Sequence, residues 1–255
     1  MKMKTIILAG GWGTRMGHLT ELIPKPMVSI GNRPIIWHIM QSYSKYGYND
    51  FIIALGVKGD VIKRYFMDFS YLNNDFSIDF DKNKIKIINE RKVNWKIKLI
   101  DTGLNTLKGA RIKMLENYLD EGSNMLTYGD GLSNVNIKDL IKFHKSHGKI
   151  ITFTGVHPSG RFGEFEENNN IVSSFSEKPQ KRRTYINGGF MIFEKKLLDY
   201  LTTNENCDLE FGIMELLAKK GQVMVYKHEG FWACMDHERD VKHLNDLWKS
   251  KKAFW

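Results

Sequence analysis

A glycine-rich segment near the start of the chain has the residue types of an anion-binding loop. It reads Leu-Ala-Gly-Gly-Trp-Gly-Thr-Arg over residues 8–15 and follows a short apolar run. Small residues let backbone N–H groups approach a phosphate closely, and Arg15 adds a planar guanidinium that suits phosphate oxygens. Lys25, set between Pro24 and Pro26, adds a second cation on a restricted backbone. The segment therefore predicts a phosphate site.

Two other phosphate-binding motifs do not fit this segment. A dinucleotide fingerprint needs a third glycine where Met16 stands, and the zone about 20 residues further on reads as a helix, with no acidic residue ending a strand. An ATP-binding P-loop needs a glycine followed by Lys-Ser or Lys-Thr, and no glycine here has that spacing. The loop is therefore a different kind of anion cradle.

Two aspartates far apart in the chain are candidate metal ligands. Asp130 lies between Gly129 and Gly131 just past a predicted strand, and Asp236 follows another. Ligands bind outside the carboxyl ends of strands in open α/β sheets, and Mg²⁺ prefers a few carboxylates together with waters and phosphates. Taken alone, Asp236 also fits the N-cap of the helix that follows it.

These residues are positioned by a predicted alternation of strands and helices. We expect strands at 6–8, 51–55, 96–100, 124–127, 150–156, 186–194 and 222–227. We expect helices at 33–46, 60–69, 110–118, 137–147, 210–219 and 239–249. Segments 161–166 and 171–177 predict a hairpin around an asparagine-rich turn. This order predicts an α/β fold with a Rossmann-like mixed, mostly parallel sheet flanked by helices, and a small β-rich extension.

Composition favours a single globular domain over residues 1–255. The chain is 42% hydrophobic, which argues against wholesale disorder, and it holds no apolar stretch of the ~20 residues that cross a bilayer. Cys207 and Cys234 lack metal-ligand spacing, so a reduced, cytoplasmic protein without a membrane partner is expected. The net charge of +9 comes from scattered lysines, which suit small polyanions, and no nucleic-acid partner is expected.

The N-terminal segment also carries a family resemblance. LAGGWGTRMGHLTELIPKPM resembles the signature of the sugar-1-phosphate nucleotidyltransferase superfamily, G-G-x-G-T-R followed by P-K-P. Further segments are similar to the bacterial glucose-1-phosphate cytidylyltransferase (CDP-glucose pyrophosphorylase) branch, among them IDTG, LTYGDGL, GRFGEF, SEKP, INGGFMIFE and FWACMDHERD. The resemblance runs nearly end to end. It implies a nucleotide-diphospho-sugar transferase type of fold, with residues 1–157 mainly binding the nucleotide and 158–255 mainly binding the acceptor and adding the closing helices.

The resemblance implies roles for individual residues. Arg15, Lys25 and Asp130 would be catalytic, and Asp130 and Asp236 would bind Mg²⁺. The nucleotide would be bound by Leu8, Ala9, Gly10, Gly11, Gly13, Thr14, Arg15, Lys25, Thr106, Arg111 and Gly129. The acceptor would be bound by Glu177, Lys178, Asn187 and Gly188. Without the resemblance, Glu177 and Lys178 fit the end of a strand, and Asn187 and Gly188 fit a turn.

The predicted reaction is transfer of CMP from CTP to α-D-glucose 1-phosphate, giving CDP-glucose and pyrophosphate with Mg²⁺. The sequence departs from the family pattern at three positions, Trp12, Ala110 and Leu209, so two substrate alternatives stay open. One is dTTP or UTP in place of CTP, and the other is another sugar 1-phosphate or a non-sugar phosphate as acceptor. A non-catalytic sugar-nucleotide sensor is an alternative of another class. The resemblance also implies a homo-oligomer, with a hexamer as one candidate.

Overall fold

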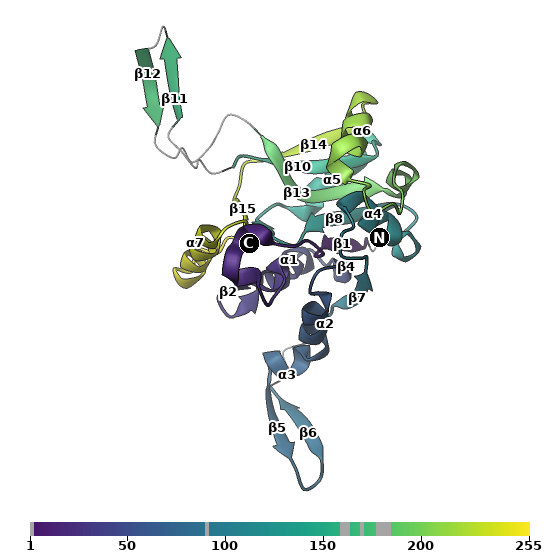
Figure 1. Cartoon of the computed structure of the whole chain (residues 1–255), viewed down its shortest axis with the longest axis vertical. Helices are drawn as coiled ribbons and strands as arrows, with labels where there is room; N and C mark the ends of the chain where they lie inside the picture. Colours follow the sequence, from purple (N-terminus) through teal and green to yellow (C-terminus); the bar gives the residue numbers. More distant parts are fainter. Residues whose placement is uncertain (1–2, 90–91, 159–163, 169–170, 177–184) are drawn as a thin grey trace.

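A mixed sheet forms the centre of the molecule. The computed structural model describes residues 3–89, 92–158, 164–168, 171–176 and 185–255. Within them, seven strands form one sheet in the order β14-β10-β13-β8-β1-β4-β7 (Figure 1). Their bounds are β1 Thr5–Leu8, β4 Asp50–Leu55, β7 Lys96–Asp101, β8 Ser123–Tyr128, β10 Ile151–Val156, β13 Ile186–Glu194 and β14 Val223–His228. Neighbours are parallel except where β13 pairs with β8 and β10, which confirms the mostly parallel sheet.

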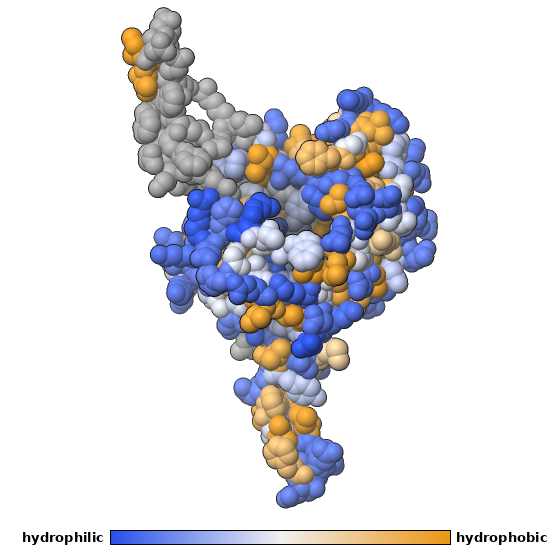
Figure 2. All heavy atoms as spheres, viewed as in Figure 1, coloured by the Kyte–Doolittle hydropathy of each residue, from blue (hydrophilic) through white to orange (hydrophobic). Residues whose placement is uncertain are grey.

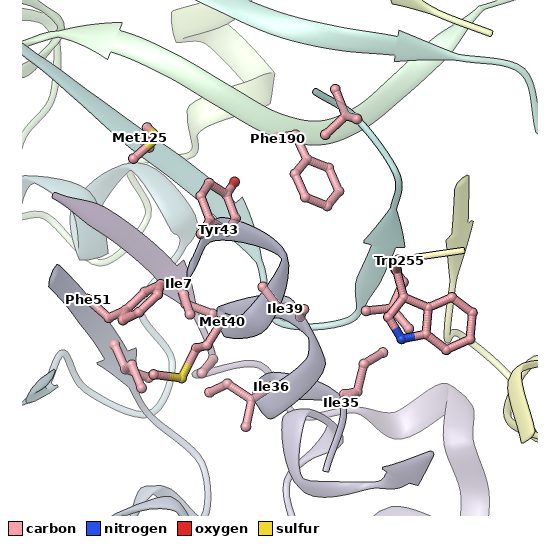
Figure 3. Packing of buried hydrophobic residues seen from close by; sticks show 14 of the residues in the cluster. Ile7, Ile35, Ile36, Ile39, Met40, Tyr43, Phe51, Met125, Phe190 and Trp255 are labelled. Carbon is pink, nitrogen blue, oxygen red and sulfur yellow. The ribbon is translucent and has the colours of Figure 1, made fainter. Parts of the chain in front are cut away.

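Helices cover both faces of the sheet. The α-helices of the described residues are α1 Ile35–Ser44, α2 Gly59–Met67, α3 Phe69–Asn73, α4 Lys108–Met114, α5 Ile137–His147, α6 Glu215–Lys219 and α7 Glu238–Lys249. Residues of α1, α5 and α7 join one buried core with Ile7, whereas residues of α4 and α6 join a second core with Ile6. Successive strand side chains point to opposite faces, so β1 supplies both cores. Figure 3 shows Ile7 beside Ile36, Ile39 and Met40 of α1.

The ends of α5 follow from local sequence. The Asn136 side chain accepts hydrogen bonds from the backbone N–H groups of Lys138 and Asp139 at 3.0 and 3.3 Å, which satisfies two donors at the helix start. Gly148 takes the left-handed conformation (φ 66°) just after the last turn. Both signals are visible in the chain, and the predicted helix 137–147 is confirmed at both ends.

Four predicted helices begin, end or break differently. The helix expected at 110–118 is α4 (Lys108–Met114), and a separate 3-10 turn follows it at Glu116–Tyr118. The helix expected from residue 33 begins at Ile35, because Pro34 is extended and forms the two-residue strand β3 (Arg33–Pro34) with β2 (Ser29–Ile30). The helix expected at 60–69 ends at Met67, and α3 follows after the non-helical Asp68. The segment Leu209–Met214 is a π-helical turn broken at Gly212 (φ 90°) before α6 begins.

Several short strands were not predicted from the sequence. β9 (Gly131–Ser133) pairs with β15 (Trp232–Cys234), and β5 (Asp75–Asp79) pairs with β6 (Lys84–Ile88) in a ribbon that projects from the body (Figure 1). Strands of three residues show too few alternations to be recognised as periodic. No strand was predicted for residues 75–88, although the alternation of apolar and charged residues there fits strands with one polar side.

The predicted hairpin after residue 158 is present as β11 (Glu164–Asn168) and antiparallel β12 (Ile171–Ser176). Residues 161–163, 169–170 and 177, which the prediction included, lie outside the described residues. No helix in the described ranges has the length and apolar character needed to cross a membrane. The division into a nucleotide-binding part, 1–157, and an acceptor-binding part, 158–255, stays a prediction.

Candidate active site

The glycine loop leaves the carboxyl end of β1 and turns into a 3-10 helix at Thr14–Thr20. Gly13 has φ 68°, a left-handed conformation that side chains other than glycine rarely adopt. A Cβ on Gly10 would lie 2.3 Å from a guanidinium nitrogen of Arg111, so this position has no room for a side chain. The loop conformation therefore depends on at least two of its glycines.

Lys25 lies at the centre of the candidate site. Its Nζ lies 2.6 Å from Oδ2 of Asp130 and 2.5 Å from Oδ1 of Asp236. Burial lowers the pKa of Lys25, but the two carboxylates outweigh that effect and raise the pKa above its ordinary value. Lys25 is therefore a cation at neutral pH, suited to neutralise phosphate charge and not to accept a proton.

The pairing of β9 with β15 brings the two aspartates together. Asp130 immediately precedes β9, and Asp236 follows β15 by two residues. Gly131 pairs with Cys234, and the backbone N–H of Met235 donates to the carbonyl of Asp130 at 2.8 Å. This short ladder places two carboxylates more than 100 residues apart in the chain against one ammonium group. The predicted convergence of Asp130 and Asp236 is present.

Arg15 extends the charged cluster towards solvent. Its guanidinium NH1 lies 3.0 Å from Oδ2 of Asp236, while 67% of its side chain stays exposed. Burial raises the pKa of Asp236, and the Lys25 and Arg15 cations lower it by more, so the net shift is downward. Asp236 is thus ionised at neutral pH, and Arg15 is accessible to an incoming anion.

Arg111 is buried beneath the glycine loop, with 4% of the residue exposed. NH1 donates to the carbonyls of Leu55 and Gly103 at 2.9 and 2.8 Å and to Oγ1 of Thr102 at 2.7 Å. NH2 donates to the carbonyl of Gly10 at 3.1 Å. One side chain on α4 thereby ties together the chain at the carboxyl ends of β1, β4 and β7. Its predicted contact with the nucleotide stays a prediction.

A cleft of about 1660 Å³ runs past these groups. The predicted nucleotide-binding residues all line it, namely Leu8, Ala9, Gly10, Gly11, Gly13, Thr14, Arg15, Lys25, Thr106, Arg111 and Gly129. Asp130, Asp236 and Asn187 line it as well. Gly188 does not, and its carbonyl instead accepts a hydrogen bond from the indole Nε1 of Trp232 at 2.8 Å. Glu177 and Lys178 lie outside the described residues.

Comparison with known proteins identifies the family. The family model described as "Nucleotidyl transferase" matches residues 4–253. The chain belongs to the nucleotidyl transferase family.

Two curated relatives cover this nucleotidyl transferase almost completely. It is 42% identical to the glucose-1-phosphate cytidylyltransferase of Salmonella typhimurium over 254 residues, which cover 99% of this chain and 98% of the relative. It is 38% identical to a Bacillus subtilis protein named probable glucose-1-phosphate cytidylyltransferase, with 99% of each chain covered.

Solved structures show the same fold at lower sequence identity. HddC from Yersinia pseudotuberculosis superposes with a TM-score of 0.70 at 22% identity, covering 96% of this chain and 99% of that one. A UDP-glucose pyrophosphorylase in complex with UDP-glucose gives a TM-score of 0.69 at 15% identity, with 98% and 100% covered. These likenesses show the sheet architecture of the nucleotidyl transferase and carry no claim about its substrates.

The two carboxylates of this nucleotidyl transferase fit a divalent metal. Oxygens of Asp130 and Asp236 approach the same Lys25 nitrogen, so two hard donors already converge on a small volume. Within the ranges that the structure describes, no three His, Cys, Asp or Glu side chains gather into a complete protein cage. Mg²⁺ fits such a partial donor set, because it keeps waters and takes substrate phosphates as further ligands.

A second polar cluster lines the cleft and was not predicted as a unit. The Tyr128 hydroxyl lies 2.5 Å from Oε1 of Glu210, and Nδ2 of Asn187 donates to that hydroxyl at 3.2 Å. Lys108 Nζ lies 2.6 Å from Oε2 of Glu210. Asn187 of this cluster was among the predicted acceptor-binding residues, and Tyr128 directly precedes the Gly-Asp-Gly segment at the end of β8. The cluster offers a carboxylate and an amide that can hydrogen-bond hydroxyl groups.

Proposed function

We propose that this nucleotidyl transferase transfers CMP from CTP to α-D-glucose 1-phosphate, releasing pyrophosphate and forming CDP-glucose. The observation that carries the proposal is the contact of Lys25 with both Asp130 and Asp236 beside the glycine loop. The names of the relatives that match nearly the whole chain support the choice of nucleotide and acceptor.

An acceptor phosphate oxygen attacks the α-phosphorus of the nucleotide, a new P–O bond forms, and the bond to the bridging oxygen of pyrophosphate breaks. The glycine loop offers backbone N–H groups to the phosphates, and Arg15 approaches them from its exposed position. Lys25 remains protonated and neutralises the charge that develops on the leaving pyrophosphate. The residues of the chain align the two substrates and stabilise the charge that develops, and no covalent enzyme intermediate is required.

Asp130 and Asp236 are the residues that would hold Mg²⁺. When bound, the ion supplies positive charge to the triphosphate. Phosphate oxygens of the nucleotide would compete with the two carboxylates for the ammonium group of Lys25. On the acceptor side, Asn187, Glu177 and Lys178 are the proposed contacts.

Pyrophosphate release tests the proposal. Purified protein is supplied with CTP, dTTP, UTP and other nucleotides in all pairings with sugar 1-phosphates and Mg²⁺. We expect the highest kcat/KM for CTP with α-D-glucose 1-phosphate, and higher turnover of a different pair would replace the substrate assignment. Nucleotide binding without turnover of any pair would leave a sensor as the function.

Asp130→Asn keeps the size of the side chain and removes its charge. We expect a loss of turnover on the order of 10²–10³, the effect of removing one preorganised charged group from a reaction centre. Circular dichroism should show an unchanged fold. Near-normal turnover in the folded variant would refute the site assignment.

The proposal also includes the cellular location and the assembly of the enzyme. We propose that it acts in the cytoplasm, which agrees with the unpaired thiols of Cys207 and Cys234. We also propose that it is a homo-oligomer, as the resemblance implies.

A further inference from the structure

Helix α7 turns different sides to the core, to solvent and to the cleft. Leu244 is fully buried in the core, whereas Lys242 is exposed to solvent. Arg239, His243 and Leu247 follow one another at intervals of four residues, so they lie along one side of the helix, and all three line the cleft. The proposed reaction assigns no contact to these three side chains.

The cleft has more volume than one ligand commonly fills. Small-molecule pockets measure about 300–1,000 Å³, and this cleft measures about 1660 Å³. Its predicted nucleotide-binding residues reach as far as Arg111 on α4, and Figure 1 shows α4 and α7 on opposite sides of the body. The lining continues past α7 with Phe254, whose ring centre lies 5.9 Å from that of Phe231. The α7 end of the cleft is therefore a separate part with its own side chains.

Positive charge at the α7 end of the cleft is only weakly neutralised. The Arg239 side chain is 57% exposed, and its Nε lies 3.7 Å from Oδ1 of Asp240, an ion pair of the kind that contributes little in water. The other oxygen of Asp240 accepts hydrogen bonds from the backbone N–H groups of Asp236 and His237 at 3.0 and 2.8 Å, so this carboxylate serves the start of the helix. One turn further on, the exposed His243 adds a ring N–H donor. Figure 2 shows hydrophilic side chains gathered where α7 lies in Figure 1.

The start of α7 is held against the segment that carries Arg15. His18, in the 3-10 helix that includes Arg15, has its Nδ1 3.0 Å from Oε1 of Glu238, the first residue of α7. Further along α7, Oδ1 of Asn245 accepts a hydrogen bond from the backbone N–H of Gly31 at 2.9 Å, which fixes the helix against the body. Arg15 and Arg239 therefore reach the cleft from two segments in direct contact, and both guanidinium groups are largely exposed to an anion there.

We propose that Arg239 and His243 form a second anion subsite, which receives the pyrophosphate that leaves the glycine loop. The inference rests on the proposed function, which makes pyrophosphate a product of this cleft. On direct escape into water, pyrophosphate loses its contacts with Arg15, Lys25 and the loop N–H groups together. A guanidinium fork and a ring N–H on α7 replace some of these contacts before the others break. Product release limits the turnover of many enzymes, so the subsite would speed the step that frees the active site.

Binding of pyrophosphate alone tests the subsite without turnover. Titration calorimetry with the full-length protein and Mg²⁺ gives Kd in wild type and in Lys25→Met, where the phosphate site at the glycine loop lacks its central cation. Arg239→Gln is then made in both backgrounds. Lys242→Gln, which removes the same charge from the same helix outside the cleft lining, is the matched control. In the Lys25→Met background we expect Arg239→Gln to weaken pyrophosphate binding about tenfold, the effect of losing a charge-assisted hydrogen bond, and Lys242→Gln to change it less than about twofold.

Because this readout needs no turnover, its failure is distinct from failure of the proposed reaction. Circular dichroism establishes that each variant is folded, and if Arg239→Gln does not fold, Arg239→Lys replaces it and should weaken binding about threefold through loss of the fork. Unchanged pyrophosphate binding in the Arg239 variant would overturn the proposal. Equal weakening in the Arg239 and Lys242 variants would overturn it in favour of diffuse surface charge.

Kinetics separate product release from binding of the triphosphate. In a single turnover, formation of the sugar nucleotide is followed by quenched flow, and free pyrophosphate by a coupled phosphate assay. We expect Arg239→Gln to lengthen the delay between the two signals about threefold and to leave kcat/KM for CTP unchanged. An unchanged delay would overturn the proposal. An equal fall of kcat and kcat/KM would also overturn it, because Arg239 would then contact the triphosphate during the chemical step.

Discussion

At the scale of single residues, the candidate site is a balance of partly buried charges and one exposed charge. Lys25 lies within hydrogen-bonding distance of two carboxylates, and Arg15 contacts one of them from the solvent side. Removing one member of such a group leaves a partly buried partner with fewer opposite charges, which costs more than the contact itself contributes. The same arrangement is poised to accept phosphate charge, since a triphosphate can replace the carboxylates as partner of the ammonium group.

Lys25→Met tests this balance. Loss of the ammonium removes the contact of Lys25 with both Asp130 and Asp236, leaves Arg15 as the cation on Asp236, and takes one cation from the nucleotide site. We expect kcat to fall by about 10²–10³. Steady-state pyrophosphate release is the measurement. Lys142→Gln, a loss of the same charge at an exposed position of α5, is the control and should keep full activity.

At the scale of elements, the cleft depends on how strand ends are held. Because β1, β4 and β7 are parallel, their carboxyl ends lie at the same edge of the sheet, and Arg111 on α4 binds a carbonyl at each of these ends. On the other side, the three-residue pairing of β9 with β15 sets the distance between Asp130 and Asp236. The candidate catalytic side chains lie on loops, and the buried strands and helices hold those loops in one conformation.

Arg111→Lys tests whether the hydrogen bonds of Arg111 stabilise the fold. Lysine keeps the positive charge but cannot donate in five directions, so several buried carbonyls lose their partner. We expect the free energy of unfolding to fall by about 2–4 kcal/mol. Urea denaturation measures the change. Lys113→Gln on the same helix removes only an ion pair with Glu116 near the surface and should change the free energy of unfolding by less than about 1 kcal/mol. Equal losses of stability in both variants would contradict a stabilising role of the Arg111 hydrogen bonds.

At the scale of the whole molecule, two cores hold one sheet between layers of helices, while the β5–β6 ribbon projects from it (Figure 1). Buried polar groups inside this body couple folding to pH. His144 lies between α5 and the sheet, 2.8 Å from Oγ1 of Thr152 and 3.0 Å from Oε1 of Glu194. Burial lowers the pKa of His144 more than the Glu194 carboxylate raises it.

The sign of this shift predicts loss of stability in mild acid. A histidine whose pKa is lower in the folded state binds its proton more readily when unfolded, so the stability it contributes is present above its unfolded pKa of about 6.5 and declines as pH falls below it. We expect Tm to drop between pH 7.5 and 5.5. In His144→Gln the drop should be smaller, as measured by differential scanning calorimetry; an identical pH dependence would exclude His144 as a source.

Much of the architecture and of the candidate site could be predicted from the amino-acid sequence. Continuous apolar runs predicted β1, β4, β8 and β13, because strands covered on both faces need no polar side. Asn136 and Gly148 marked both ends of α5. The glycine loop with Arg15 and Lys25 predicted an anion site from residue chemistry alone, and the cleft is lined by these residues.

Other features were decided by the tertiary structure. The convergence of Asp130 and Asp236 depends on a strand pair too short to show a period, and the donors of Arg111 are directed at carbonyls that carry no sequence signature. The side of α7 that lines the cleft was identified only by which of its residues pack in the core and which reach the cleft. Local sequence determines which groups can do chemistry and where strands and helices form. Distances between remote side chains arise from pairing and packing across the whole chain, so they are set only when the chain folds.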